Sequence, residues 1–204
     1  MNKIIAATGN MGKLREIREI CQGLPFEITS LKDHFDPLPV IPEDGSTFLE
    51  NARQKAQWVY SRTGLWSLAD DSGLEVDFLG GQPGVFSARY AGEHATDEQR
   101  VSKLLAACEG CPPDRRTARF RCVVVLHCGD NDEIVGRGTC EGRIGYAPKG
   151  SDGFGYDPVF FPSGYDRTFA ELSALEKNSI SHRGKALNDL RRNLDERWKD
   201  RHDI

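Results

Sequence analysis

The segment from Thr8 to Lys13 has the residue types of an anion site. It follows an apolar run and precedes residues at helical spacing, which predicts a strand that turns at glycine into a helix. Such a turn presents free backbone N–H groups at the positive end of a helix dipole, where phosphate is the commonest anion. Thr8 and Asn10 add side-chain donors, and Lys13 adds a positive charge. A plain strand-to-helix turn with a solvated lysine is the alternative, and the spacing of a Walker A loop is absent.

Asp70 and Asp71 are adjacent carboxylates, expected at the end of a short apolar strand over residues 66–69. Their repulsion and their burial near apolar walls both cost free energy, and a divalent cation would offset both costs. Oxygen ligands of this kind suit Mg²⁺. Glu43, or less favourably Asp44, would complete the site if the fold brings its loop close. A solvent-facing acidic turn is the alternative, and an EF-hand is excluded by the spacing.

Glycines surround two aromatic residues, Phe154 and Tyr156, in segment 150–158. A glycine-rich backbone can approach a flat ligand, and aromatic faces can stack on it, which is worth about 1–3 kcal/mol per nucleic acid base. A loop whose aromatic side chains pack against its own core is the alternative.

A basic segment follows at residues 177–184. Ser181 is expected to cap the last helix, which would put His182 and Arg183 at its N-terminus. The helix dipole disfavours cations there, so an anionic or carbonyl-bearing ligand would compensate. A solvated basic turn is the alternative.

Strands and helices alternate along the chain, which predicts an α/β fold with a mixed sheet. The proline-containing segment 36–45 is expected to be a loop, and capping boxes at Thr47–Glu50 and Thr96–Gln99 predict helix starts. Strands are expected at 2–8, 26–31, 66–69, 120–127 and 133–140, with a hairpin turn at 129–132; further helices are expected around 14–21 and from 183 onward.

Composition narrows the class of protein. The chain has 204 residues, with 38% hydrophobic and 28% charged residues, which is typical of a globular protein of one large domain. The formal net charge of -4 disfavours general nucleic-acid binding. No apolar run approaches the roughly 20 residues of a membrane span, and the apolar start is too short for a signal peptide. A cytoplasmic location is therefore expected.

The six cysteines are accordingly expected to be reduced thiols. Cys108 and Cys111 have the spacing of a zinc or redox pair. No second such pair follows, and Cys108 also ends an apolar helical stripe, so a place in the core is favoured.

Taken together, these segments resemble the inosine/xanthosine triphosphate pyrophosphatase family, whose members hydrolyse non-standard purine nucleoside triphosphates to the monophosphate and pyrophosphate. The resemblance extends over residues 3–195. Besides the four segments above, its motifs are Asp70-Asp71-Ser72-Gly73-Leu74, Thr47-Phe48-Leu49-Glu50-Asn51-Ala52 and Pro83-Gly84-Val85-Phe86-Ser87-Ala88-Arg89-Tyr90.

The resemblance implies an elongated, two-lobed α/β fold with a central mixed sheet flanked by helices and a nucleotide cleft between the lobes. It implies one pyrophosphatase domain over residues 1–195 with a tail at 196–204, and a cytoplasmic homodimer that requires Mg²⁺. Partners other than the purine nucleotide, such as nucleic acid or a membrane, are not expected.

The resemblance also assigns roles to residues. Asp71 would be the proton acceptor and, with Glu43, would engage Mg²⁺. The residues that would bind substrate are Thr8, Gly9, Asn10, Met11, Gly12, Lys13, Ser72, Phe154, Gly155, Tyr156, Asp157, Lys177, His182 and Arg183. Arg183 is the expected donor to the 6-oxo group of the base, and Phe154 the ring that stacks on it.

Three other functions stay open on the sequence. A related family cleaves pyrimidine nucleoside triphosphates at the same bond. Aspartyl-phosphate phosphatases also place aspartates after a strand, but they need a spaced DxD pair, whereas Asp70 and Asp71 are adjacent. A nucleotide sensor without turnover would have little reason to place bare carboxylates at a phosphate site.

Overall fold

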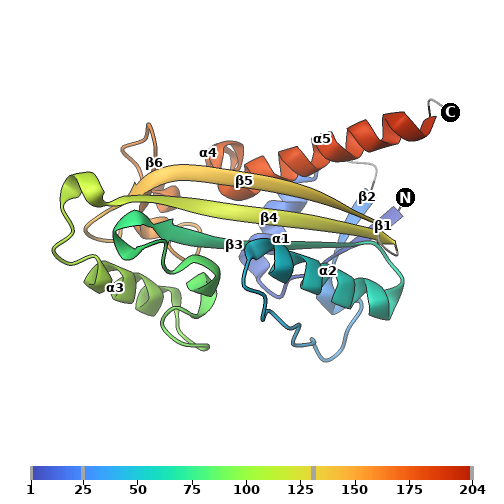
Figure 1. Cartoon of the computed structure of the whole chain (residues 1–204), viewed down its shortest axis with the longest axis horizontal. Helices are drawn as coiled ribbons and strands as arrows, with labels where there is room; N and C mark the ends of the chain where they lie inside the picture. The colour runs from blue at the N-terminus through green and yellow to red at the C-terminus, as the bar shows by residue number, and fades with distance from the viewer. Residues whose placement is uncertain (1, 24–25, 130–131, 203–204) are drawn as a thin grey trace. The chain divides into compact units, whose positions relative to one another are not determined.

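The computed structural model describes residues 2–23, 26–129 and 132–202 (Figure 1). Its strands are β1 (Asn2–Ala6), β2 (Phe26–Ser30), β3 (Ser67–Val76), β4 (Thr117–Gly129), β5 (Asp132–Ile144) and β6 (Phe160–Pro162). Its α-helices are α1 (Met11–Ile20), α2 (Phe48–Thr63), α3 (Asp97–Ala107), α4 (Ala174–Ile180) and α5 (His182–His202).

The strands form one sheet in the order β2-β1-β3-β4-β5-β6. Strand β1 pairs in parallel with β2 and with β3, where Ile5 lies opposite Ser67. Strand β6 pairs antiparallel with β5. The sheet is therefore mixed, and the predicted α/β class is confirmed.

The chain divides into two compact units. Unit 1 consists of Met1–Asp71, Cys122–Gly138 and Arg183–Ile204, and unit 2 consists of Ser72–Arg121 and Thr139–His182. Strands β3, β4 and β5 each contribute residues to both units. The assignment of residues 1–195 to a single domain stays a prediction.

In unit 1, helices cover both faces of the sheet. Ile4 and Ile5 are adjacent in β1 and both fully buried, but they belong to different core clusters because successive side chains of a strand point to opposite faces. Ile4 shares its cluster with residues of α1 and α5, such as Leu187, while Ile5 shares its cluster with Ala52 and Ala56 of α2. The prediction of a first strand buried on both faces is confirmed.

The core of unit 2 is formed by α3, the second half of β3 and a group of aromatic rings. Leu104 of α3 packs in one cluster with Leu74 and Val76, and Phe120, Phe160 and Phe169 contact one another there.

Cys108 and Cys111 are both buried in the unit 2 core and carry free thiols. Burial raises the pKa of Cys108, although Arg116 opposes the shift. Within the described residues, no three His, Cys, Asp or Glu side chains are grouped to hold a metal ion. Both cysteines therefore pack in the hydrophobic core of unit 2.

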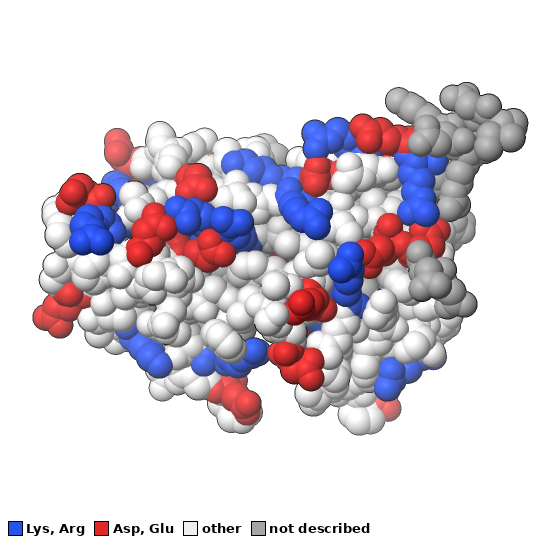
Figure 2. Space-filling model, in the orientation of Figure 1, with Lys and Arg blue, Asp and Glu red and all other residues white. Residues whose placement is uncertain are grey.

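Charged side chains on the unit 2 part of β4 form ion pairs. Arg119 and Arg121 of β4 contact Glu75 of β3, and Arg119 also contacts Asp77 and Glu141. On the face shown in Figure 2, basic and acidic side chains are interspersed. Among the described residues, no helix is long and apolar enough to span a membrane.

The secondary structure differs from the sequence-based expectation in two respects. The strand expected to end at Ala69 continues as β3 to Val76, so Asp70 and Asp71 lie inside a strand. The short elements β6 and α4 were not predicted. The expected hairpin turn at 129–132 includes residues 130 and 131, which lie outside the described residues.

Candidate active site

The turn from β1 leads directly into the N-terminus of α1, as predicted, but the side-chain oxygens of Thr8 and Asn10 act as hydrogen-bond acceptors within it rather than as donors to a ligand. Anion binding by this turn stays a prediction. Asn10 is the N-cap of α1, and its side-chain oxygen accepts a hydrogen bond from the Lys13 backbone N–H at 3.0 Å. Thr8 Oγ1 accepts the Asn10 N–H at 3.2 Å. Gly9 is exposed, and a Cβ added there would meet nothing within 4 Å. The fold therefore leaves open space beside the backbone at this position.

Asp70 and Asp71 have different partners because they lie on opposite faces of β3. Asp70 is contacted by Lys13 and Arg183, whereas Asp71 is contacted by Asn51 and Lys55. The electrostatic repulsion between these two carboxylates, from which the sequence predicts a shared divalent cation, is therefore reduced because their side chains point in opposite directions. Each carboxylate is compensated on its own side.

Asp70 is the centre of a buried ion-pair cluster in unit 1. Its Oδ2 lies 3.2 Å from Lys13 Nζ and 2.9 Å from Arg183 Nη2, and Arg183 also pairs with the buried Glu16. Burial alone would raise the pKa of Asp70, but Lys13, Arg183 and Lys55 together hold it well below its ordinary value. Asp70 is thus an ionised structural carboxylate that fixes Lys13.

The same cluster gives Arg183 a role that the sequence did not predict. Its side chain is 1% exposed, and its Nε, Nη1 and Nη2 groups all donate to Asp70 or Glu16. The partner Asp70 lies 113 positions away in sequence, so the pairing depends on the fold. The expected contact of Arg183 with the base stays a prediction.

Asp71 lies closer to the surface and is held by α2. Its Oδ2 accepts a hydrogen bond from Asn51 Nδ2 at 3.0 Å, and its Oδ1 lies 3.5 Å from Lys55 Nζ. Burial raises its pKa, against the opposing effects of Lys55 and Lys13. A carboxylate with a raised pKa is a better proton acceptor than an ordinary surface aspartate.

Glu43 reaches the same lysine. Lys55 Nζ lies 3.0 Å from Glu43 Oε1, and the Lys55 side chain is 6% exposed. Glu43 and Asp71 therefore converge on one positive charge. Two carboxylates with this convergence fit Mg²⁺, which is commonly held by one or two carboxylates and by substrate phosphate oxygens.

In unit 2, the glycine-rich loop is joined to α4 by an ion pair. Lys177 Nζ lies 2.6 Å from Asp157 Oδ2 and 4.8 Å from the centre of the Phe154 ring. The same Asp157 oxygen accepts the Phe154 N–H at 2.9 Å. The half-buried Phe154 ring is thus held by its own loop and by a lysine.

Two more contacts hold this loop. Gly155, at φ 63°, donates its N–H to Asp97 Oδ2 of α3 at 2.7 Å. The buried Tyr156 donates its hydroxyl to Ser87 O at 2.9 Å. The loop is therefore positioned by two neighbouring segments of unit 2.

His182 and Ser72 complete the expected residues of unit 2. His182 is buried and stacks on Phe120 with ring centres 4.6 Å apart, so its ring is part of the aromatic core. It is the first residue of α5, as the expected cap at Ser181 required. Ser72 is half-buried in β3, directly after Asp71.

Four polar residues in these contacts were missed from the sequence: Asn51, Lys55, Asp97 and Glu16. Asn51 and Lys55 are four positions apart on α2 and lie next to Ala52 and Ala56, so they continue the apolar face of this helix. Polar residues on an apolar stripe are buried and need partners, and this signal would have identified both.

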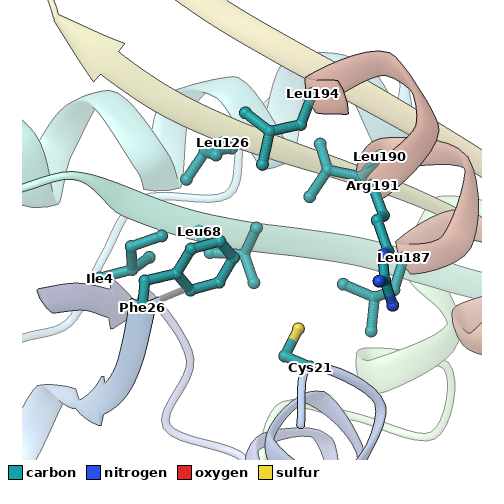
Figure 3. A pocket seen from close by; sticks show the side chains of 9 residues that line it. All are labelled: Ile4, Cys21, Phe26, Leu68, Leu126, Leu187, Leu190, Arg191 and Leu194. Carbon is teal, nitrogen blue, oxygen red and sulfur yellow. The ribbon is translucent and has the colours of Figure 1, made fainter. Parts of the chain in front are cut away.

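A small cavity lies elsewhere in unit 1, between α1, α5 and the sheet (Figure 3). Its volume is about 10 Å³, and Ile4, Phe26 and Leu190 are among the side chains that line it. Cys21 also lines it, and burial raises the pKa of this thiol to about 11. An apolar cavity that is just large enough for one water stays empty of polar ligands, so it is a packing defect rather than a site.

Comparison with known proteins identifies the family of the chain. The Ham1 family matches residues 4–193. A protein named dITP/XTP pyrophosphatase from Vibrio cholerae is 48% identical over 198 residues, covering 96% of this chain and 98% of the relative. A protein of the same name from Geobacter sulfurreducens is 50% identical over 194 residues, covering 95% of this chain and 97% of the relative.

A solved structure has the same fold. A HAM1 protein from Coxiella burnetii superimposes with a TM-score of 0.86 at 44% identity, covering 96% of this chain and all of the other. The match extends over both units and all the residues described above, so the chain belongs to the Ham1 family.

Proposed function

We propose that this protein hydrolyses non-standard purine nucleoside triphosphates, such as dITP, ITP and XTP, to the nucleoside monophosphate and pyrophosphate. The observation that carries the proposal is the placement, within unit 1, of a phosphate-type turn with Lys13 beside the Asp70–Asp71 pair. The names of its relatives, which share nearly half of its residues, support the substrate class.

In this proposal, unit 1 supplies the groups that act on the triphosphate. Thr8 and Asn10 hold the turn by hydrogen bonds within it. The backbone N–H groups of Gly9, Met11 and Gly12 and the ammonium of Lys13 would bind the leaving pyrophosphate. Water attacks the α-phosphorus, and Asp71 accepts its proton. Positioned positive charge supplies most of the acceleration in phosphoryl transfer, because charge gathers on the phosphoryl oxygens and on the leaving group.

Glu43 and Asp71 would hold Mg²⁺, which when bound supplies Lewis-acid stabilisation of phosphate oxygens. The protein groups remain responsible for orientation. Asn51 and Lys55 hold the Asp71 carboxylate, and Asp70 holds Lys13.

Other residues of the proposed set would select the base. Phe154 stacks on the purine, and Ser72, Gly155, Tyr156, Asp157, Lys177 and His182 complete the substrate-binding set, with Arg183 of unit 1. A site that donates hydrogen bonds to a 6-oxo group leaves those donors unpaired against the 6-amino group of ATP, and such mismatches can reach about 10⁴–10⁵-fold discrimination.

We further propose a cytoplasmic homodimer without a nucleic-acid or membrane partner. Sedimentation of the purified chain tests the dimer directly. A mass of one chain at micromolar concentration would contradict it.

The test of function is pyrophosphate release from ITP, dITP, XTP, ATP, GTP, dTTP and UTP, with Mg²⁺ and with EDTA. Metal-dependent release from the first three, with ATP and GTP nearly inert, is expected. Release from dTTP or UTP would indicate the pyrimidine enzymes instead. Orthophosphate in place of pyrophosphate would contradict the mechanism, and tight binding without turnover would indicate a sensor.

Asp71→Asn tests the assigned base. Turnover of ITP should fall by about 10²–10⁴-fold, the usual contribution of a general base, while nucleotide binding is retained. The matched control is Asp114→Asn, the same change on an exposed carboxylate of unit 2 that belongs to none of the proposed sites. Near-normal turnover of the Asp71 variant would remove this residue from the mechanism.

A further inference from the structure

The segment of residues 43–47, called the 43–47 loop below, lies along the first two turns of α2. Each of its residues forms a hydrogen bond or an ion pair with this helix. Glu43 pairs with Lys55, Asp44 bonds Gln54, Gly45 bonds Asn51, and the backbone N–H groups of Ser46 and Thr47 donate to Glu50. The position of Glu43 is thereby set by the helix rather than by the loop alone.

Gly45 shows how close the loop comes to the helix. A Cβ added there would lie 2.7 Å from Glu50 Cβ and 2.8 Å from Asn51 Oδ1. Real Cβ atoms essentially never come that close to other heavy atoms. Glycine is thus required at this position by contact, and the distance between loop and helix leaves little freedom.

Asn51 joins this loop to β3. Its Oδ1 accepts the Gly45 N–H at 2.8 Å, and its Nδ2 donates to Asp71 Oδ2 at 3.0 Å. The residue is 1% exposed. One side-chain amide therefore connects the segment that carries Glu43 to the carboxylate of Asp71.

The side-chain amide of Asn51 serves both neighbours. A backbone N–H needs an acceptor and an ionised carboxylate needs a donor, and Asn offers one of each. A carboxylate at position 51 would repel Asp71, and an alkyl side chain would leave a buried N–H and a buried oxygen without partners. The chemistry of the two neighbours thus accounts for the residue type.

Lys55 adds a second connection from the same helix face, one turn further along. Its ammonium lies 3.0 Å from Glu43 Oε1 and 3.5 Å from Asp71 Oδ1. Two side chains of one helix, Asn51 and Lys55, thus hold the carboxylates of Glu43 and Asp71 near the same ammonium group.

We propose that Asn51 is a positioning residue that sets the geometry of Glu43 relative to Asp71, and through it the affinity of this pair for a divalent cation. The inference rests on the proposed function, since it takes these two carboxylates as the metal ligands. Partners of metal ligands commonly change metal affinity by 10–100-fold when they are removed.

The test is direct binding of Mn²⁺, followed by its electron paramagnetic resonance signal, with and without pyrophosphate. Asn51→Ala should raise the dissociation constant by 10–100-fold. The matched control is Gln54→Ala, which removes the adjacent bond between loop and helix at Asp44 and should stay within twofold of wild type. Asn51→Ser, a smaller polar side chain, replaces the alanine variant if that variant does not fold.

Each outcome bears on a different statement. Unchanged Mn²⁺ affinity in the Asn51 variants, with wild type active, overturns the inference and leaves the proposed function standing. Equal weakening in the Gln54 control would show that any loosening of the loop suffices, which also overturns a specific role for Asn51. Absence of Mn²⁺ binding by wild type overturns the inference together with the proposed metal, while pyrophosphate release separately tests the reaction.

Discussion

At the scale of single residues, the adjacent carboxylates Asp70 and Asp71 have separate partners because successive side chains of a strand point to opposite faces of the sheet. Asp70 is buried among Lys13, Arg183 and Glu16, and Asp71 is held by α2. The residue types of the expected site were predictable from the sequence, because glycines, lysines and carboxylates cluster there. The partner of each charge was not, since it depends on which elements become neighbours.

The environment of Asp70 predicts acid sensitivity. Because its pKa is lowered in the folded state, its ionised form stabilises the fold above the unfolded pKa of about 3.9, and this stabilisation is lost as pH falls below that value. Asp70→Asn should destabilise the protein by about 3–5 kcal/mol at pH 7, since it removes the carboxylate that Lys13 and the buried Arg183 share and leaves Arg183 with Glu16 alone. Below about pH 4 the variant should lose less stability per pH unit than wild type. Urea unfolding between pH 3 and 7 measures both effects, and parallel pH profiles would contradict the assignment.

At the scale of elements, the helix starts were the most predictable features. Thr47 and Thr96 form the expected capping boxes at α2 and α3. These boxes could be predicted because the N-cap side chain bonds a residue only three positions later in the sequence. The end of β3 was not predictable, since the pairing that continues it past Asp71 is not local. Strand β6 and helix α4 have only 3 and 7 residues, too few to show a period.

The first turn of α3 also predicts an effect on substrate binding. Asp97→Ala removes the acceptor of the Gly155 N–H, so the glycine-rich loop should lose its fixed position. The KM for ITP should rise by about tenfold or more, since a hydrogen bond to a charged group contributes about 1.5–3 kcal/mol. Steady-state kinetics measure this, and Glu98→Ala, an exposed acidic neighbour in the same turn, is the control. A change confined to kcat would show that the loop does not hold the substrate.

At the scale of the whole molecule, strands β3, β4 and β5 each contribute residues to both compact units. The α/β class and the mixed sheet were predictable from the alternation of elements, because periodicity reports which faces are buried. The division into two units was not predictable from periodicity, since each of β3, β4 and β5 changes unit along its length.

This continuity predicts cooperative unfolding. Trp58 and Trp66 belong to unit 1, whereas the buried Cys108 and Cys111 belong to unit 2. Tryptophan fluorescence and thiol accessibility therefore report separate units, and their transitions in urea should coincide, because loss of a shared strand disrupts both cores. Two separated midpoints would show that the units unfold independently.

The stepwise bonding of the 43–47 loop to α2 also constrains how the gene can change in length. One codon inserted between positions 47 and 50 would lengthen the chain between the two members of every one of these pairs and would move Glu43 away from Lys55. The preceding segment, where Val40 is 94% exposed, has no such pairing to preserve among the described contacts. Insertions and deletions that accumulate during evolution should therefore be tolerated more readily within residues 36–42 than between residues 43 and 51.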